Sequence, residues 1–333
     1  MKNILIVGGT GDKPSGVIYK LYDVFKNKTN DRVTSINGSK LPTDITDDNL
    51  VLWMPDISNE EPKDYPVKAQ GSVLICSKVM RKETTRIDAV TRIFNMHGNA
   101  VIAITKKDDI FEFELIDALN NTWIKTTKIE ALVFTIESFY NWTIGSKRVS
   151  LKKSPKFIDI KVADTAVLEF LNTNKQLALK VAEGCGNRFF GNYSTRCTRL
   201  FPTTRLGFEL FFFSPRNVAK QFVTEKDLVL VDNEHYYGDK KPSVDTPVQL
   251  ELYKIFPRIN YMIHGHAYIK NALTTEHYYP CGDLREVQGA EDLLATGTTR
   301  INLKNHGFLL TGASTREMRE HLAQCEFIAL GGK

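Results

Sequence analysis

The chain has 333 residues, of which 42% are hydrophobic and 25% charged, a composition typical of a globular protein long enough for two domains. It has no run of about 18 apolar residues and no signal-peptide pattern at its start, so we expect a cytoplasmic protein without a membrane partner. The net charge of +5 comes from 44 basic and 39 acidic residues that are intermixed, which argues against a nucleic-acid partner.

Short apolar segments alternate with helical patterns in the first half of the chain. Residues 16–25 and 82–96 have helical periodicity. Alternation of strand and helix predicts a Rossmann-like domain over residues 1–150, built on a parallel sheet covered by helices. A basic run from Ser146 to Lys156 is expected to be a solvated linker that ends this domain. The predicted strands are 3–9, 32–36, 49–55, 72–79 and 100–105.

A glycine-rich turn, "GGTGDKPSG", follows the first predicted strand. The backbone amides of Gly8, Gly9 and Gly11 could bind a phosphate or nucleotide at the start of the next helix. Pro14 stands where the third glycine of the dinucleotide fingerprint would fall. Nucleotide binding and a simple glycine-rich turn therefore both stay open.

The sequence of the second half of the chain predicts a different α/β domain, over residues 160–333. Helical patterns occur at 164–183 and 315–330. Buried strands are predicted at 207–213, 228–232 and 259–269. Strands and helices alternate less regularly than before, which favours a mixed or antiparallel sheet with helices on its faces.

The segment "MIHGHAYI" contains two histidines that are one residue apart in a predicted strand. Side chains two positions apart share one face of a strand, so His264 and His266 can reach one metal ion. His306 and Asp245 extend this set to three imidazoles and a carboxylate, which suits Zn²⁺, with Mn²⁺ or Co²⁺ as substitutes. Two hydrogen-bonded core histidines are the alternative interpretation. The five cysteines form no CxxC pair, so we expect neither a disulfide framework nor a cysteine-built zinc site.

Several linked motifs resemble the class II aldolase and adducin family. They cover roughly residues 165–330 and comprise "GNYSTR", "SPRNVAKQFVTEKDLVLVD", "KPSVDTPVQLELYKIFPRINYMIHGHA" and "KNHGFLLTG". The resemblance implies an α/β/α domain in which His264, His266 and His306 bind zinc. It matches Asp245 to a position that is a catalytic glutamate in the aldolases and a metal-binding aspartate in the epimerase.

The same resemblance implies a substrate class and a reaction. It places four residues around a substrate phosphate, namely Gly191, Asn192, Ser194 and Ser243. The implied function is that of a zinc-dependent, aldolase-type lyase acting on a phosphorylated or anionic sugar-like substrate through a metal-stabilised enediolate. Family members commonly form symmetric tetramers, so a homo-oligomer is implied as well. Epimerisation, dehydration and a non-catalytic, adducin-like binding role with a nucleotide-binding N-terminal domain stay open.

The chain departs from the family pattern at two places. Arg216 and Asn217 stand where sugar-phosphate aldolases have Thr-Gly, so Arg216 either clamps the anionic group or fills its pocket. No tyrosine follows Tyr279, although the aldolases and epimerases use a C-terminal tyrosine as proton donor. The segment 274–287 supplies Asp283 and Glu286 as candidate catalytic substitutes, and Cys281 as a thiol close to the metal or a small hydrophobe.

Overall fold

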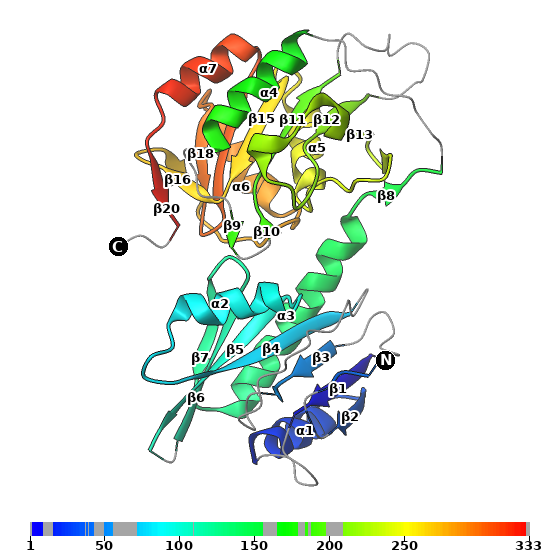
Figure 1. Ribbon diagram of the computed structural model, residues 1–333, viewed down its shortest axis with the longest axis vertical. Coiled ribbons are helices and arrows are strands. Elements are labelled where there is room, and N and C mark those ends of the chain that lie inside the picture. Colours follow the sequence, from blue (N-terminus) through cyan, green and yellow to red (C-terminus); the bar gives the residue numbers. More distant parts are fainter. Residues whose placement is uncertain are drawn as a thin grey trace. The chain divides into compact units, whose positions relative to one another are not determined.

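The chain divides into two compact units, Met1–Ile144 and Gly145–Lys333. The structure is a computed structural model (Figure 1). It describes residues 2–8, 16–36, 38, 40–42, 50–55, 72–108, 110–155, 165–178, 184–185, 188–197 and 209–330. Among these residues, no helix has both the length and the hydropathy that a membrane span requires. The predicted domain limits, 1–150 and 160–333, stay predictions.

The first unit is built on a seven-stranded sheet with the order β2-β1-β3-β4-β5-β6-β7. The pairs from β2 to β5 are parallel, whereas β6 and β7 are antiparallel additions at one edge. The strands are β1 (Asn3–Val7), β2 (Arg32–Ile36), β3 (Leu50–Trp53), β4 (Val73–Met80), β5 (Ala100–Lys107), β6 (Ile110–Asp117) and β7 (Thr122–Thr126).

Helices cover both faces of this sheet. Helices α1 (Gly16–Lys28) and α3 (Ile129–Val149) share one hydrophobic core with alternate residues of the strands. Helix α2 (Arg86–Asn95) packs near β4 and β5 and begins with a capping box between Thr85 and Asp88. The parallel sheet predicted from the alternating pattern is thus confirmed, with an antiparallel hairpin added to it.

The basic run that was expected to be a linker is regular structure in large part. Its first residues form the last turn of α3, which ends at Val149. Lys152 and Lys153 then form β8 (Lys152–Lys153), an edge strand that pairs with β14 of the second unit. The linker prediction is therefore wrong for these residues, because lysine stems are compatible with both a helix end and a sheet edge.

The second unit contains a nine-stranded sheet of order β17-β18-β19-β15-β11-β12-β13-β14-β8. Most pairs are antiparallel, whereas β14 with β8 and β17 with β18 are parallel. Besides β8, the strands are β11 (Asn192–Arg196), β12 (Phe211–Phe213), β13 (Val229–Val231), β14 (His235–Tyr237), β15 (Tyr261–Gly265), β17 (Leu273–Thr274), β18 (Arg300–Leu303) and β19 (Gly307–Gly312). Two small sheets pair β9 (Gly184–Cys185) with β10 (Arg188–Phe189), and β16 (Ala267–Ile269) with β20 (Phe327–Ala329).

Two separate cores lie on the two faces of the large sheet. Helices α4 (Thr165–Ala178) and α7 (Thr315–Ala323) contribute to one core. Helices α5 (Thr246–Ile255) and α6 (Glu286–Leu294) contribute to the other. Short 3-10 turns, η3 (Lys220–Phe222) and η4 (Glu225–Asp227), follow β12. The α/β/α architecture with a mixed sheet is as predicted.

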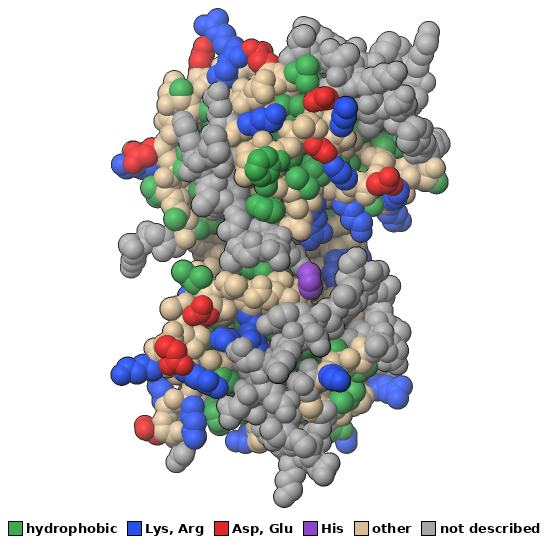
Figure 2. All heavy atoms as spheres, viewed as in Figure 1, with side chains coloured by type: hydrophobic (Ala, Val, Ile, Leu, Met, Phe, Trp, Pro, Cys, Tyr) green, Lys and Arg blue, Asp and Glu red, His purple; other side chains and the backbone are tan. Residues whose placement is uncertain are grey.

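Two predicted elements have different limits in the structure. The closing helix ends at Ala323, and residues 327–329 form β20 rather than a continuation of the helix. The strand predicted over 259–269 is divided at His266 into β15 and β16, which belong to different sheets. On the face in view, acidic side chains are scattered among the basic ones (Figure 2). Exposed ion pairs of the second unit include Lys270–Glu326 and Arg316–Glu320.

Candidate metal centre

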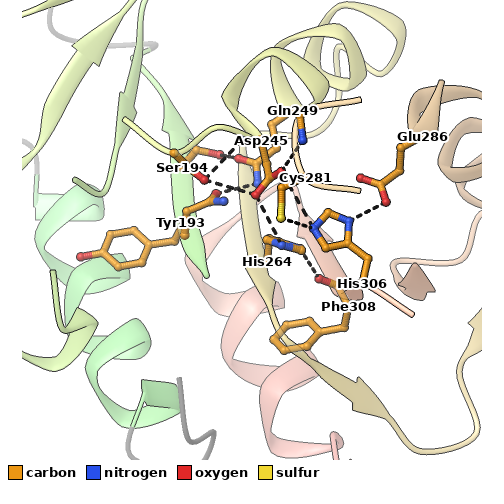
Figure 3. Close-up of polar contacts among 12 residues, drawn as sticks. Tyr193, Ser194, Asp245, Gln249, His264, Cys281, Glu286, His306 and Phe308 are labelled. Atoms are coloured by element: carbon orange, nitrogen blue, oxygen red, sulfur yellow. Dashed lines mark hydrogen bonds and ion pairs between the residues drawn. The ribbon is translucent and has the colours of Figure 1, made fainter. Parts of the chain in front are cut away.

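The candidate site lies at the end of β15, on the sheet face covered by α5 and α6. Met262 packs in the α5 and α6 core, and alternation along the strand turns His264 toward the same face. Asp245 immediately precedes α5, and Glu286 begins α6. His306 lies in the tight turn between β18 and β19. Segments far apart in the sequence therefore meet at one point (Figure 3).

Three imidazoles converge there. The ring centroids are 5.1 Å apart for His264 and His266, 4.8 Å for His264 and His306, and 5.4 Å for His266 and His306. His264 and His306 are buried, and His266 stacks on the ring of Phe190 at 5.1 Å. Mutual distances of this size let three nitrogen atoms reach one ion.

Hydrogen bonds fix the orientation of two of the rings. His264 Nδ1 lies 2.9 Å from the carbonyl oxygen of Phe308, and His306 Nδ1 lies 2.7 Å from Glu286 Oε1. If each Nδ1 carries the hydrogen and donates it, Nε2 of each ring carries the lone pair and can accept or bind a metal. This arrangement, in which a carbonyl or carboxylate holds the rear nitrogen, is typical of histidines that bind metals.

The Asp245 carboxylate lies between the two oriented histidines. Its Oδ2 is 3.7 Å from His264 Nε2, and its Oδ1 is 3.9 Å from His306 Nε2. Although Asp245 is at the N-cap position of α5, its side chain makes no capping bond. Oδ1 instead accepts from the Gly282 amide at 2.8 Å, and Oδ2 accepts from the Ser243 hydroxyl at 3.2 Å. The carboxylate is thus held toward the histidines.

Burial and charge favour the neutral form, which is the form that binds metals, in two of the three rings. Burial, assisted by the nearby His306, lowers the pKa of His264 to about 4, and burial lowers the pKa of His266 well below its ordinary value. Burial opposes protonation of His306 too, but the Glu286 carboxylate outweighs it and raises the pKa of that ring. His264 and His266 are therefore neutral near pH 7.

The donor atoms fit a divalent cation. His264 Nε2 and His266 Nδ1 are buried and have no hydrogen-bond partner among the described residues. A buried polar atom without a partner costs about 1–3 kcal/mol, so a ligand for these nitrogens would remove a penalty. Ligand atoms of Asp245, His266, Cys281 and His306 also lie within 4.8 Å of one another. Imidazole and carboxylate together suit Zn²⁺, Co²⁺ or Mn²⁺.

Cys281 is the member of this group to which the sequence assigned no clear role. Its Sγ lies 3.3 Å from His306 Nε2 (Figure 3). Burial raises the pKa of the thiol to about 11. In the sequence, only its place in the segment that follows the strand of His264 and His266 indicated that it could lie close to the metal.

The four residues expected around the substrate phosphate differ in whether their polar groups are available to a ligand. Asn192 pairs with His264 across β11 and β15, and its Nδ2 is buried and has no hydrogen-bond partner in the part of the chain that the structure describes. Ser194 is fully buried, and its hydroxyl contacts Gln249 and Tyr253 on α5. Gly191 has a φ of +72°, in the left-handed region, and Ser243 contacts Asp245. Asn192 is thus the best placed of the four to donate to a ligand, whereas the Ser194 hydroxyl is engaged within the core.

Arg216 and its neighbours form the loop after β12. Arg216 is exposed, and Asn217 adopts a φ of +57°, a conformation that suits the glycine of the family motif. The sequence analysis missed Lys220, which is 4% exposed and donates to the carbonyl oxygen of Val218 at 2.7 Å. Its positive charge is one of the smaller influences that lower the pKa of His266. No periodicity distinguishes this lysine from a surface one.

The two candidate catalytic carboxylates have different surroundings. Glu286 is buried behind His306, where burial raises its pKa. Asp283 forms an ion pair with Arg285 at 2.6 Å. Glu286 therefore acts on the site through His306 in this structure, and a catalytic role for either residue stays a prediction.

The glycine-rich turn of the first unit is described in part only. Gly9 and Gly11 lie outside the described residues. The Gly8 amide donates to the Ile36 carbonyl at 3.1 Å, and a Cβ at Gly8 would lie 2.7 Å from the Met54 carbonyl oxygen. Close strand packing alone therefore requires a glycine there, and nucleotide binding stays a prediction.

Comparisons with known proteins point to one family. Residues 171–299 match the family model described as the class II aldolase and adducin N-terminal domain. An L-fuculose phosphate aldolase from Methanococcus maripaludis is 27% identical over 146 residues, which are 36% of this chain and 79% of the relative.

Two solved structures are similar to this chain at lower sequence identity. An aldolase II superfamily protein from Pseudomonas syringae is 16% identical, with a TM-score of 0.37, over 48% of this chain and 71% of its own. The N-terminal class II aldolase domain of a conserved protein from Thermoplasma acidophilum is 14% identical, with a TM-score of 0.37, over 50% of this chain and 92% of its own.

Proposed function

We propose that the protein is a metal-dependent lyase of the aldolase type, because residues 171–299 match the class II aldolase and adducin N-terminal domain. Its substrate would be a phosphorylated or otherwise anionic sugar-like molecule. The observation that carries this proposal is the convergence of three imidazoles on one point beside the Asp245 carboxylate. The buried nitrogens of His264 and His266 that lack a partner support it further.

His264, His266, His306 and Asp245 would hold the cation, with zinc as the expected ion and Mn²⁺ or Co²⁺ as substitutes. Such an ion, when bound, polarises a substrate carbonyl and stabilises the negative charge that develops as a bond to the neighbouring carbon breaks. The chain's own residues orient the ligands, because Phe308 and Glu286 bind the rear nitrogens of His264 and His306.

Asp245 would move a proton close to the metal. Its two oxygens are held by the Gly282 amide and the Ser243 hydroxyl, which fixes their direction. Asn192 offers a buried Nδ2 donor next to His264 in the sheet register. We expect Asn192 to donate to a substrate oxygen, because a buried amide without a partner gains most from a new acceptor.

The loop after β12 would bind the anionic group. Arg216 is exposed and free to bind a phosphate or carboxylate bidentately. Lys220 adds a buried positive charge close enough to influence His266. Two cations in one loop favour the clamp over the alternative in which Arg216 fills the pocket.

The first experiment measures metal content by mass spectrometry on protein purified without a histidine tag. We expect about one zinc, manganese or cobalt ion per chain in the wild type and its loss from the His264→Ala, His266→Ala double variant. His277→Ala serves as the matched control, because the His277 side chain is 68% exposed and lies outside the converging set.

Turnover assays on the metal-loaded protein then test the reaction. A panel of sugar phosphates is screened for retro-aldol cleavage, epimerisation and dehydration. Loss of turnover in Asp245→Asn with metal retained would support the proton-transfer role. A wild type that binds no metal even after reconstitution would overturn the proposal.

A further inference from the structure

Cys281 is positioned among the proposed metal ligands. Its Sγ is 3.3 Å from His306 Nε2, the nitrogen left free when Nδ1 of that ring donates to Glu286. The thiol belongs to the set of four groups whose ligand atoms lie within 4.8 Å of one another, with Asp245, His266 and His306. The close-up view shows the sulfur directed toward the histidines from the segment that precedes α6 (Figure 3).

Two other thiols, those of Cys76 and Cys325, contact backbone carbonyl groups. Cys76 donates to the Ala100 carbonyl at 3.4 Å, and Cys325 donates to the His321 carbonyl at 3.1 Å. These are contacts of thiols within packed structure. Cys281 instead faces a ring nitrogen and a carboxylate, both of which are groups that bind metals.

The backbone holds Cys281 in this place. The next residue, Gly282, has a φ of +78°, and its amide donates to Asp245 Oδ1 at 2.8 Å. A Cβ at Gly282 would lie 2.9 Å from the Val244 carbonyl oxygen. This close turn ties the Cys281 segment to the segment that carries Asp245, so the thiol and the carboxylate stay side by side.

We propose that Cys281 binds the metal ion directly through its thiolate, which gives the centre a nitrogen, oxygen and sulfur ligand set. This inference rests on the metal site of the proposed function. Binding of the cation displaces the thiol proton to solvent, because the thiolate is the form that coordinates metals. A soft sulfur ligand favours Zn²⁺ and Co²⁺ over Mg²⁺ and Mn²⁺.

Cobalt substitution tests the inference. Wild-type protein loaded with Co²⁺ should show a near-ultraviolet charge-transfer band from thiolate to metal. Cys281→Ser should lose this band while it retains about one cobalt per chain, and Cys325→Ser should keep both. Bound cobalt without the band in the wild type, or a band that persists in Cys281→Ser, would overturn the inference.

A second measurement needs no variant and does not depend on how Cys281→Ser folds. X-ray absorption of the zinc-loaded wild type should contain a zinc–sulfur shell at about 2.3 Å. A shell of nitrogen and oxygen only, with one zinc bound per chain, would refute Cys281 as a ligand and leave the proposed function intact. Absence of bound metal would refute both.

Discussion

At the scale of single residues, the hydrogen-bond partner of a proposed metal ligand sets the orientation of that ligand. Glu286 Oε1 lies 2.7 Å from His306 Nδ1 and orients the ring so that Nε2 faces the other ligands. Glu286→Gln keeps the shape of the side chain but removes the charge, and its amide can present either an acceptor or a donor. We expect the variant to bind zinc about 10–100-fold more weakly.

Competition with a chromogenic chelator would measure this change in affinity. Glu291→Gln is the matched control, because Glu291 lies on the same helix and is outside the group of ligand atoms. Equal affinities for the two variants would show that Glu286 does not position His306.

The sequence predicted the histidines better than their surroundings. Strand periodicity predicted a shared face for His264 and His266, and His306 and Asp245 extended this set before the resemblance matched all four to family positions. The contact of Glu286 with His306 crosses 20 residues, and the approach of Cys281 depends on the turn at Gly282. Such contacts depend on tertiary packing, so no local pattern predicts them.

At the scale of elements, the approach of β19 to β15 shapes the site. Gly307 begins β19 directly after His306, and a Cβ there would clash with the Gly265 carbonyl oxygen. Gly307→Ala must therefore separate β15, which carries His264, from β19, which begins directly after His306. We expect it to lower the free energy of unfolding by about 1–3 kcal/mol, the usual cost of overpacking, and to lower zinc occupancy.

Urea denaturation followed by circular dichroism, together with metal analysis, checks this expectation. Gly145→Ala in α3 is the control, for which we expect a higher free energy of unfolding. A Cβ at Gly145 meets no neighbouring atom within 4 Å, and alanine in a helix interior is favoured over glycine by about 1 kcal/mol. A Gly307→Ala protein with wild-type stability and full zinc occupancy would contradict the argument.

The elements themselves were predicted where periodicity is regular. The five parallel strands of the first sheet and the helices that follow β1 and β4 are where the alternation placed them. The β6–β7 hairpin was missed, although its turn residue Asn120 has a φ of +66°, a conformation that asparagine tolerates well. The last helix was extended too far because "FIA" is apolar in any conformation, and only its pairing with β16 makes it a strand.

At the scale of the whole molecule, the positions of the tryptophans allow unfolding of the first unit to be measured separately. All three tryptophans, Trp53, Trp123 and Trp142, belong to the unit Met1–Ile144, whereas every proposed metal ligand belongs to Gly145–Lys333. Tryptophan fluorescence therefore reports unfolding of the first unit, and calorimetry reports both.

Removal of the metal should destabilise only the second unit. An ion present at 100 times its dissociation constant stabilises the folded state that binds it by about 2.7 kcal/mol, which corresponds to roughly 5–10 °C in the melting temperature of a domain of this size. We expect a chelator to lower one calorimetric transition by that amount and to leave the tryptophan midpoint unchanged. The His264→Ala, His266→Ala protein should not respond to the chelator. An equal shift of the tryptophan midpoint would mean that the two units unfold as one cooperative body, since the fluorescent side chains are far in sequence from every proposed ligand.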